Sequence, residues 1–251
     1  ILYDKRKEAK LNELANKCLA INERTEVGWL LAAMFCDLKG ETEKAKMLVD
    51  RVLQINPSNI CAHLFKGKLL LLNGQGEQAL ISFHQANILR KDVRSFALLI
   101  SAQLAASKVK EAFNSAKECL SVAPKAATSH ILMGHSLART STTQSMGDSM
   151  RAYQKALEID GKSIIAASSL AEALSTQDKY LEAVSILKKT LDMNGKNSES
   201  HRLRTLLARC YTRMENYSAA IEELHLVIEL DPDHSEAIAE LEKCEQLLSR
   251  R

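Results

Sequence analysis

The stretch YSAAIEELHLVIELDPDH, residues 217–234, has the pattern of an amphipathic helix that ends at a proline. Its apolar residues recur at intervals of three and four, which places their side chains on one face of a helix. Pro232 lies twelve residues after Ala220, and proline cannot continue a helix. The two other prolines of the chain keep the same spacing, Pro57 after Ala45 and Pro124 after Ala112. The stretch is therefore one copy of a repeated unit.

The distances between the prolines give the length of this unit. Pro57 and Pro124 are 67 residues apart, close to two units of about 34 residues. Pro124 and Pro232 are 108 residues apart, which is three such units and six additional residues. A helical pattern with this period is the sequence signature of tetratricopeptide repeats. The sequence therefore predicts an all-α fold, a tetratricopeptide repeat solenoid in which antiparallel helix pairs form a right-handed superhelix.

The unit divides the chain into domains. Residues 26–234 are predicted to form six tetratricopeptide repeats, at 26–59, 60–92, 93–126, 127–163, 164–197 and 201–234. Residues 1–25 are predicted to end a preceding repeat with its second helix, and 235–251 to form a C-terminal capping helix with Glu and Lys on its outer face. The six additional residues are predicted in loops, three in the fourth repeat and three at 198–200. The missing first helix before residue 8 predicts that this is the C-terminal part of a longer protein.

Small residues recur at three positions of the unit. Position 20 holds Ala or Ser in all six repeats, and positions 8 and 27 are small in most of them. Small side chains let two helices approach closely where they cross. Ala79 and Ala183, both at position 20, are therefore predicted to be almost fully buried.

Composition and patterns exclude several function classes. The net charge of +3 over 251 residues is too weak to indicate nucleic-acid binding. The six cysteines are scattered, which indicates a reducing compartment, and there is no apolar run typical of a membrane span. No glycine-rich phosphate loop, His-Glu-x-x-His or Gly-x-Ser-x-Gly pattern occurs, and the seven histidines are dispersed. We predict no enzyme activity, no cofactor and no metal site.

Function is then expected from protein recognition. In tetratricopeptide proteins the first helix of each unit lines the concave face, and this implies an apolar groove at the N-terminal end and a basic one at the C-terminal end. The predicted partner-binding residues are Leu30, Met34, Leu64, Leu71, Arg202, Arg209 and Arg213. Two alternatives stay open: Leu71 and Leu72 are core residues if the repeat boundary is shifted, and the arginines form a solvated face. The Lys and Asn pair with which chaperone adaptors hold a C-terminal carboxylate is absent from positions 5 and 9.

The order of irregularities carries a closer resemblance. A degenerate unit, SFALLISAQLAASKVKEAFNSAKECLSVAP, precedes a unit with a widened turn and SMRAYQKALEID. DKYLEAVSILKKTLDMNG and MENYSAAIEELHLVIELDPDHSEAIAELEKCEQ follow. Over nearly its whole length the sequence resembles the C-terminal half of the subunit 7 family of the anaphase-promoting complex.

This resemblance implies a function and partners. It implies a non-catalytic scaffold in a cell-cycle ubiquitin ligase, found in nucleus and cytoplasm, that docks other tetratricopeptide subunits. It also implies a possible homodimer through an N-terminal half that is not in this sequence. The alternative is a tetratricopeptide adaptor that binds short linear peptide motifs transiently. A scaffold buries a wide, partly apolar surface, whereas an adaptor uses a narrow polar clamp.

Overall fold

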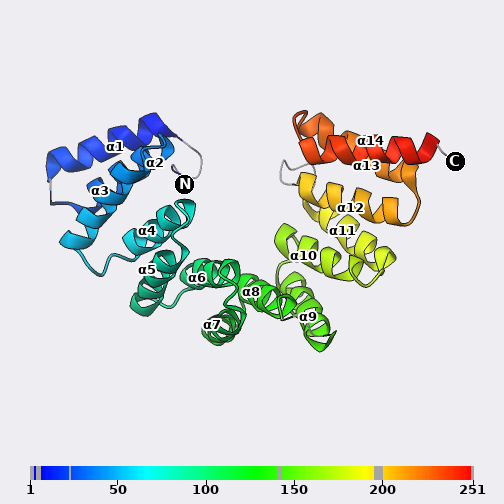
Figure 1. The fold of residues 1–251 in the computed structure, drawn as a ribbon, viewed down its shortest axis with the longest axis horizontal. Coiled ribbons are helices and arrows are strands. Elements are labelled where there is room, and N and C mark those ends of the chain that lie inside the picture. Colours follow the sequence, from blue (N-terminus) through cyan, green and yellow to red (C-terminus); the bar gives the residue numbers. More distant parts are fainter. Residues whose placement is uncertain (1–2, 4–6, 23, 141–142, 195–199, 250–251) are drawn as a thin grey trace. The chain divides into compact units, whose positions relative to one another are not determined.

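The protein is helical throughout the residues that its computed structural model describes, which are 3, 7–22, 24–140, 143–194 and 200–249. Fourteen α-helices and no β-strand occur in these ranges, so the predicted all-α class is confirmed (Figure 1). The chain divides into two compact units, residues 1–122 and 123–251. None of the helices in the described ranges is both long enough and apolar enough to cross a membrane.

Unit 1 consists of α1 (Glu8–Ile21) and three helix pairs. The pairs are α2 (Glu26–Leu38) with α3 (Thr42–Ile55), α4 (Ile60–Leu72) with α5 (Gly76–Leu89), and α6 (Val93–Ala105) with α7 (Val109–Val122). Gly40 and Gly74 close the first two pairs with φ of 78° and 73°, a conformation that glycine adopts without a steric penalty. The Asn59 side chain accepts a hydrogen bond from the Ala62 N–H and thereby starts α4.

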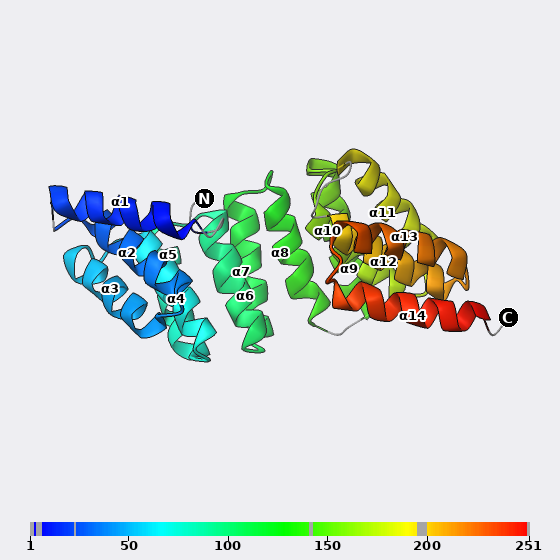
Figure 2. The ribbon, with the colours of Figure 1, turned by 90° about the horizontal axis from the view of Figure 1, so that it is seen from above.

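Unit 2 consists of three helix pairs and a terminal helix (Figure 2). The pairs are α8 (Ala127–Ala138) with α9 (Thr143–Ile159), α10 (Ile164–Ser175) with α11 (Tyr180–Asn194), and α12 (His201–Arg213) with α13 (Tyr217–Leu230). The terminal helix α14 (Ser235–Ser249) packs on α13 and buries Ala237 and Cys244. In this way the last repeat keeps its apolar side away from water.

The additional residues of the fourth repeat do not lie where they were predicted. Helix α9 has 17 residues, whereas the second helices of the other pairs have 14 or 15. The addition therefore lengthens the helix rather than the loop, because TQSMGDSM continues the helical turn despite its polar composition. Of the other predicted addition, residues 198 and 199 lie outside the described residues.

Helix crossings are built on buried small side chains, as the repeat pattern predicts. Position 20 is fully buried in all six pairs, at Ala45, Ala79, Ala112, Ser149, Ala183 and Ala220. The predicted burial of Ala79 and Ala183 is therefore confirmed. Close packing at this position fixes the approach of the two helices of each pair.

A second crossing site combines residues of complementary size. A Cβ atom on Gly67 would overlap the ring of Phe83, and one on Gly134 would overlap the ring of Tyr153. The equivalent positions of the third pair hold Ile100 and Ala116, both fully buried. A large residue on one helix is thus matched by a small one on the other, which keeps the interior filled.

Candidate protein-interaction surfaces

The first surface is a groove in unit 1 between the first helices of its repeats. It has a volume of about 330 Å³. We call it the unit 1 groove, and its lining residues are Tyr3, Leu11, Leu30, Leu31, Met34, Cys61, Leu64, Phe65, Lys68, Arg94 and Leu98. The structure thus brings together three predicted residues, Leu30, Met34 and Leu64. Their role in partner binding stays a prediction.

The leucines of α4 differ in their surroundings. Leu64 is only 7% exposed and belongs to the core cluster that contains Phe83 and Leu99. Leu71 does not line the unit 1 groove and is 38% exposed, and Leu72 is 73% exposed. The alternative that Leu71 and Leu72 are core residues is therefore wrong. Leu30 and Met34 are partly buried and pack against the neighbouring core.

Tyr3 lines the unit 1 groove. Its hydroxyl donates a hydrogen bond to the Asp37 carboxylate, and its ring meets Phe65 edge-on with 5.5 Å between centroids. The Lys68 ammonium lies 5.2 Å from the centre of the Tyr3 ring, within the range of a cation–π contact. No signal in the sequence indicated this placement, because Tyr3 precedes the first residue that fits the repeat pattern.

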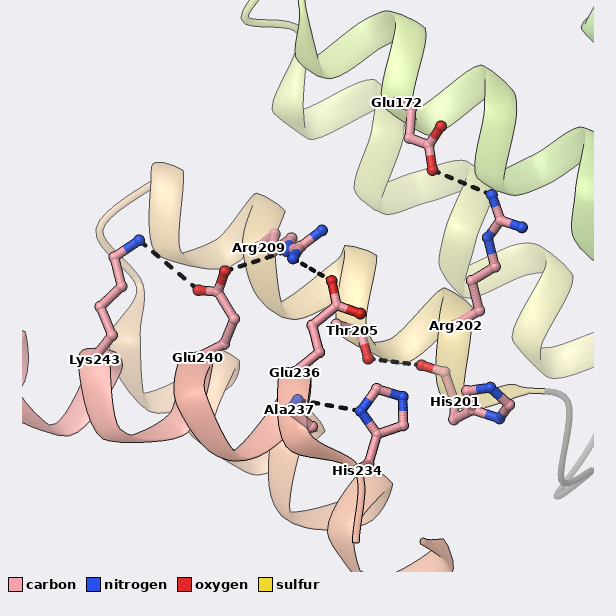
Figure 3. A network of polar contacts seen from close by, with 10 residues as sticks. All are labelled: Glu172, His201, Arg202, Thr205, Arg209, His234, Glu236, Ala237, Glu240 and Lys243. Carbon is pink, nitrogen blue, oxygen red and sulfur yellow. Dashed lines mark hydrogen bonds and ion pairs between the residues drawn. The ribbon is translucent and has the colours of Figure 1, made fainter. Parts of the chain in front are cut away.

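The second surface, in unit 2, is charged (Figure 3). Arg202 on α12 pairs with Glu172 on α10 at 3.4 Å. Arg209 pairs with two glutamates of α14, with Glu236 through Nη2 and with Glu240 through Nε at 3.3 Å. We call these five residues the unit 2 network.

Two of the three predicted arginines are therefore already neutralised by the chain itself. Arg213 is exposed, has no ion pair among the described residues, and shares a pocket with Arg209 and Asp178. The repeat pattern missed the acidic partners. The capping helix was predicted to carry its Glu and Lys residues on the outer face, but the spacing of four residues between Glu236 and Glu240 lets both reach Arg209 of α12. The position of Glu236 and Glu240 is a correction to that prediction.

A histidine contact links α8 and α10 within unit 2. His135 Nε2 lies 3.0 Å from the Ser169 hydroxyl, and its ring meets the Tyr153 ring at 5.6 Å. Burial lowers the pKa of His135, Glu172 raises it and Arg202 lowers it slightly. Burial likewise raises the pKa of Tyr153 above its ordinary value. Both side chains are therefore neutral at physiological pH.

The described residues of the two surfaces form no metal-binding cluster. Within the described ranges, no three His, Cys, Asp or Glu side chains converge in a way that could hold a metal ion. The polar groups of the unit 2 network are bonded to one another, and the unit 1 groove is mainly aliphatic and aromatic. Both arrangements are suited to binding a protein segment.

Comparison with known proteins agrees with the repeat pattern. A family model described as Tetratricopeptide repeat matches residues 176–244. The predicted tetratricopeptide repeat fold is therefore confirmed. This protein also resembles solved structures: the crystal structure of the APC/C hetero-tetramer Cut9-Hcn1 has a TM-score of 0.69 and 16% identity, over 97% of this chain and 47% of that one. A thermophilic tetratricopeptide protein of Thermus thermophilus has a TM-score of 0.62 and 15% identity, over 74% of this chain and 99% of that one. At these identities the likeness shows the fold alone.

Curated relatives are similar to this chain over nearly its whole length. Anaphase-promoting complex subunit 7 of Arabidopsis thaliana is 25% identical over 95% of this chain and 41% of the relative. The subunit of the same name from Dictyostelium discoideum is 26% identical over 93% and 40%, and the one from Homo sapiens is 22% identical over 96% and 42%. The predicted resemblance to this subunit family is confirmed. The chain spans about two fifths of the length of these relatives.

Proposed function

We propose that this chain is a non-catalytic scaffold segment of an anaphase-promoting complex, in which it docks other tetratricopeptide subunits. The observation that carries the proposal is the similarity to four curated subunit 7 proteins over 93% to 96% of the chain. A generic repeat would match mainly at the small crossing positions. Similarity over this length, which is far more than one repeat, supports a shared role.

The two surfaces support a structural role over an enzymatic one. Arg202 and Arg209 are engaged by glutamates, and His135 contacts Ser169. Groups paired within the chain in this way are not poised for proton transfer. The unit 1 groove adds apolar surface of the kind that interfaces bury at their centre. We place the protein in nucleus and cytoplasm, where the subunit family implies that the ligase works.

Affinity purification tests the proposal. The full-length protein that contains this chain is tagged and expressed at its natural level, and the proteins that co-purify are identified by mass spectrometry. We expect stoichiometric recovery of other tetratricopeptide subunits of the ligase. If the interface is largely apolar, this recovery should persist in 0.5 M salt. Recovery of short-lived, substoichiometric partners without any ligase subunit would contradict the scaffold role and favour a transient peptide adaptor.

Matched variants locate the docking surface. Met34→Lys places a charge in the unit 1 groove, and Met47→Lys places the same charge on α3, at a side chain that is 72% exposed and does not line the groove. Arg209→Gln opens the unit 2 network, with Arg151→Gln, an exposed arginine of α9, as its control. Glutamine is preferred to glutamate at 209, because a glutamate there would repel Glu236 and Glu240. If neither Met34→Lys nor Arg209→Gln lowers subunit recovery relative to its control, both predicted docking surfaces are wrong.

A further inference from the structure

A pocket of unit 1, separate from the unit 1 groove, lies between α5, α6 and the start of α7. Its volume is about 240 Å³, ample room for more than one water molecule, which takes up roughly 30 Å³ in the liquid. None of its lining residues lines the unit 1 groove. We call it the Gln103 pocket, and its lining includes Glu77, Leu80, Ile81, Gln103, Lys108 and Glu111.

Gln103 lines this pocket with an acceptor that has no donor. Its side chain is 6% exposed, and its Oε1 atom is buried without a hydrogen-bond partner among the described residues. Leu80 and Leu99, which line the pocket as well, are buried apolar residues and offer no side-chain donor. A buried amide oxygen that gives up water and gains no donor destabilises the fold. Position 103 therefore carries a polar group at a cost in stability, which is expected where a side chain serves a ligand.

The charged residues of the Gln103 pocket favour a cation. Glu77 of α5 pairs with Lys108 at 2.8 Å, so this lysine already has a counter-charge. Glu111, in the first turn of α7, is exposed and has no ion pair among the described residues. Together these three side chains leave one negative charge in excess. A pocket that combines an excess carboxylate with an unpaired acceptor is suited to a positively charged hydrogen-bond donor.

The apolar part of the lining distinguishes between the two basic side chains. Ile81 lines the pocket and is 64% exposed, so a methylene stem that lies against it removes apolar surface from water. Arginine and lysine both have such a stem, but a guanidinium is less strongly hydrated than an ammonium and leaves water at a lower cost. Its N–H groups also point in several directions, so it can donate to a buried oxygen and keep others for the rim. The pocket therefore fits arginine better than lysine.

We propose that the Gln103 pocket receives an arginine side chain of a partner protein. Gln103 Oε1 accepts a guanidinium N–H, Glu111 supplies the counter-charge, and Ile81 contacts the methylene stem. The pocket shares no residue with the unit 1 groove or the unit 2 network, so it is a third interaction surface. The inference does not rest on the scaffold role proposed above.

Titration with small probes, followed by NMR, tests the chemistry of the pocket. The probe is N-acetyl-arginine methylamide, added to the isotope-labelled 251-residue chain. The signals of the Ile81 methyl groups and of the Gln103 side-chain amide should both shift, with a dissociation constant in the millimolar range. N-acetyl-citrulline methylamide has the same shape without the charge and should bind about tenfold more weakly, because hydrogen bonds that involve a charged group are stronger. This difference should shrink as salt is added.

Variants of Gln103 test the role of the buried acceptor. Gln103→Met keeps the length of the side chain and removes its oxygen, so it should weaken binding of the arginine probe about tenfold. It should also raise the urea midpoint of the free chain, because a buried polar group without a partner is replaced by an apolar one. Gln103→Glu keeps an acceptor and should retain binding. Gln78→Met is the matched control, since Gln78 is an exposed glutamine of α5 that does not line the pocket, and it should change neither property.

Three results would overturn this inference. The first is that the Ile81 and Gln103 signals do not shift with the arginine probe, and the second is that the arginine and citrulline probes bind equally well. The third is that Gln103→Met binds the arginine probe as the wild-type chain does, which would mean that water satisfies the amide and that its role is structural. The comparison of the two probes uses the wild-type chain alone, so it decides the question even if Gln103→Met fails to fold. Co-purification of the full-length protein tests the scaffold role separately.

Discussion

The first helices of the repeats carry different chemistry in the two units. In unit 1 they present Leu30, Met34 and Leu64 to a mainly apolar groove that the Tyr3 ring also lines. In unit 2 they present Glu172, Arg202 and Arg209, which pair with residues of neighbouring helices. The helix crossings beneath are the same, since position 20 is small and fully buried throughout. The fold therefore depends on the crossings, and the groove residues are able to vary.

The two surfaces also differ in their connection to the core. Leu64 lines the unit 1 groove and belongs to a buried cluster as well. The ion pairs of Arg202 and Arg209 lie at side chains that remain about half exposed. Changes to the apolar surface should therefore alter stability, whereas changes to the charged surface should mainly alter binding. The following predictions test this contrast, from the largest effect to the smallest.

The largest effect is expected at Leu64. Leu64→Ala removes a buried side chain and leaves a cavity, and it should lower the free energy of unfolding by about 2–5 kcal/mol. Leu71→Ala, on the same helix but partly exposed, should cost much less. Urea denaturation followed by circular dichroism measures both. Similar losses for the two variants would mean that the groove and the core of unit 1 are not continuous.

The helix crossings should respond alike in both units. Ala79→Leu in unit 1 and Ala183→Leu in unit 2 overpack equivalent, fully buried sites, and each should cost about 1–3 kcal/mol. Ala105→Leu places the same side chain at an exposed helix end and should have little effect. Denaturation midpoints give the comparison. An unchanged midpoint for Ala79→Leu would break the assigned repeat register, and a loss confined to one unit would show that the crossings are not equivalent.

The repeat pattern predicted the fold because the helix crossings require small side chains and the helix ends are marked by proline. Small residues every 34 or so positions, together with Pro57, Pro124 and Pro232, report helix crossings and helix ends directly. The length of α9 was not predictable in this way, because polar residues such as those of TQSMGDSM occur both in loops and at helix starts.

The surfaces were predicted only in part. The positions of Leu30, Met34 and Leu64 within their repeats predicted that they lie together, since equivalent positions of stacked helices are side by side. It could not foresee that Glu236 and Glu240 would neutralise Arg209, because pairing depends on side-chain reach across helices. Tyr3 lay outside the register altogether.

A small effect is expected from the unit 2 network. A double-mutant cycle of Arg209→Ala and Glu236→Ala should give a coupling energy of at most about 1 kcal/mol, as is usual for exposed ion pairs. The coupling should decrease in 0.5 M salt, because mobile ions screen exposed charges. A coupling energy that exceeds this range and persists in salt would mean that the unit 2 network stabilises the fold of unit 2. It would contradict the expectation that the charged surface mainly affects binding.

The smallest effect concerns the protonation of His135. Because burial lowers its pKa in the folded state, the folded chain binds fewer protons there than the unfolded chain does. The stability that this site contributes is thus complete above the unfolded pKa of about 6.5 and is lost as the pH falls below it. Glu172 opposes the shift and Arg202 adds to it. Denaturation at pH 7.5 and 5.5 should show a smaller acid loss for His135→Asn than for the wild-type chain. An equal loss in both would mean that His135 titrates as freely in unit 2 as it does in the unfolded chain.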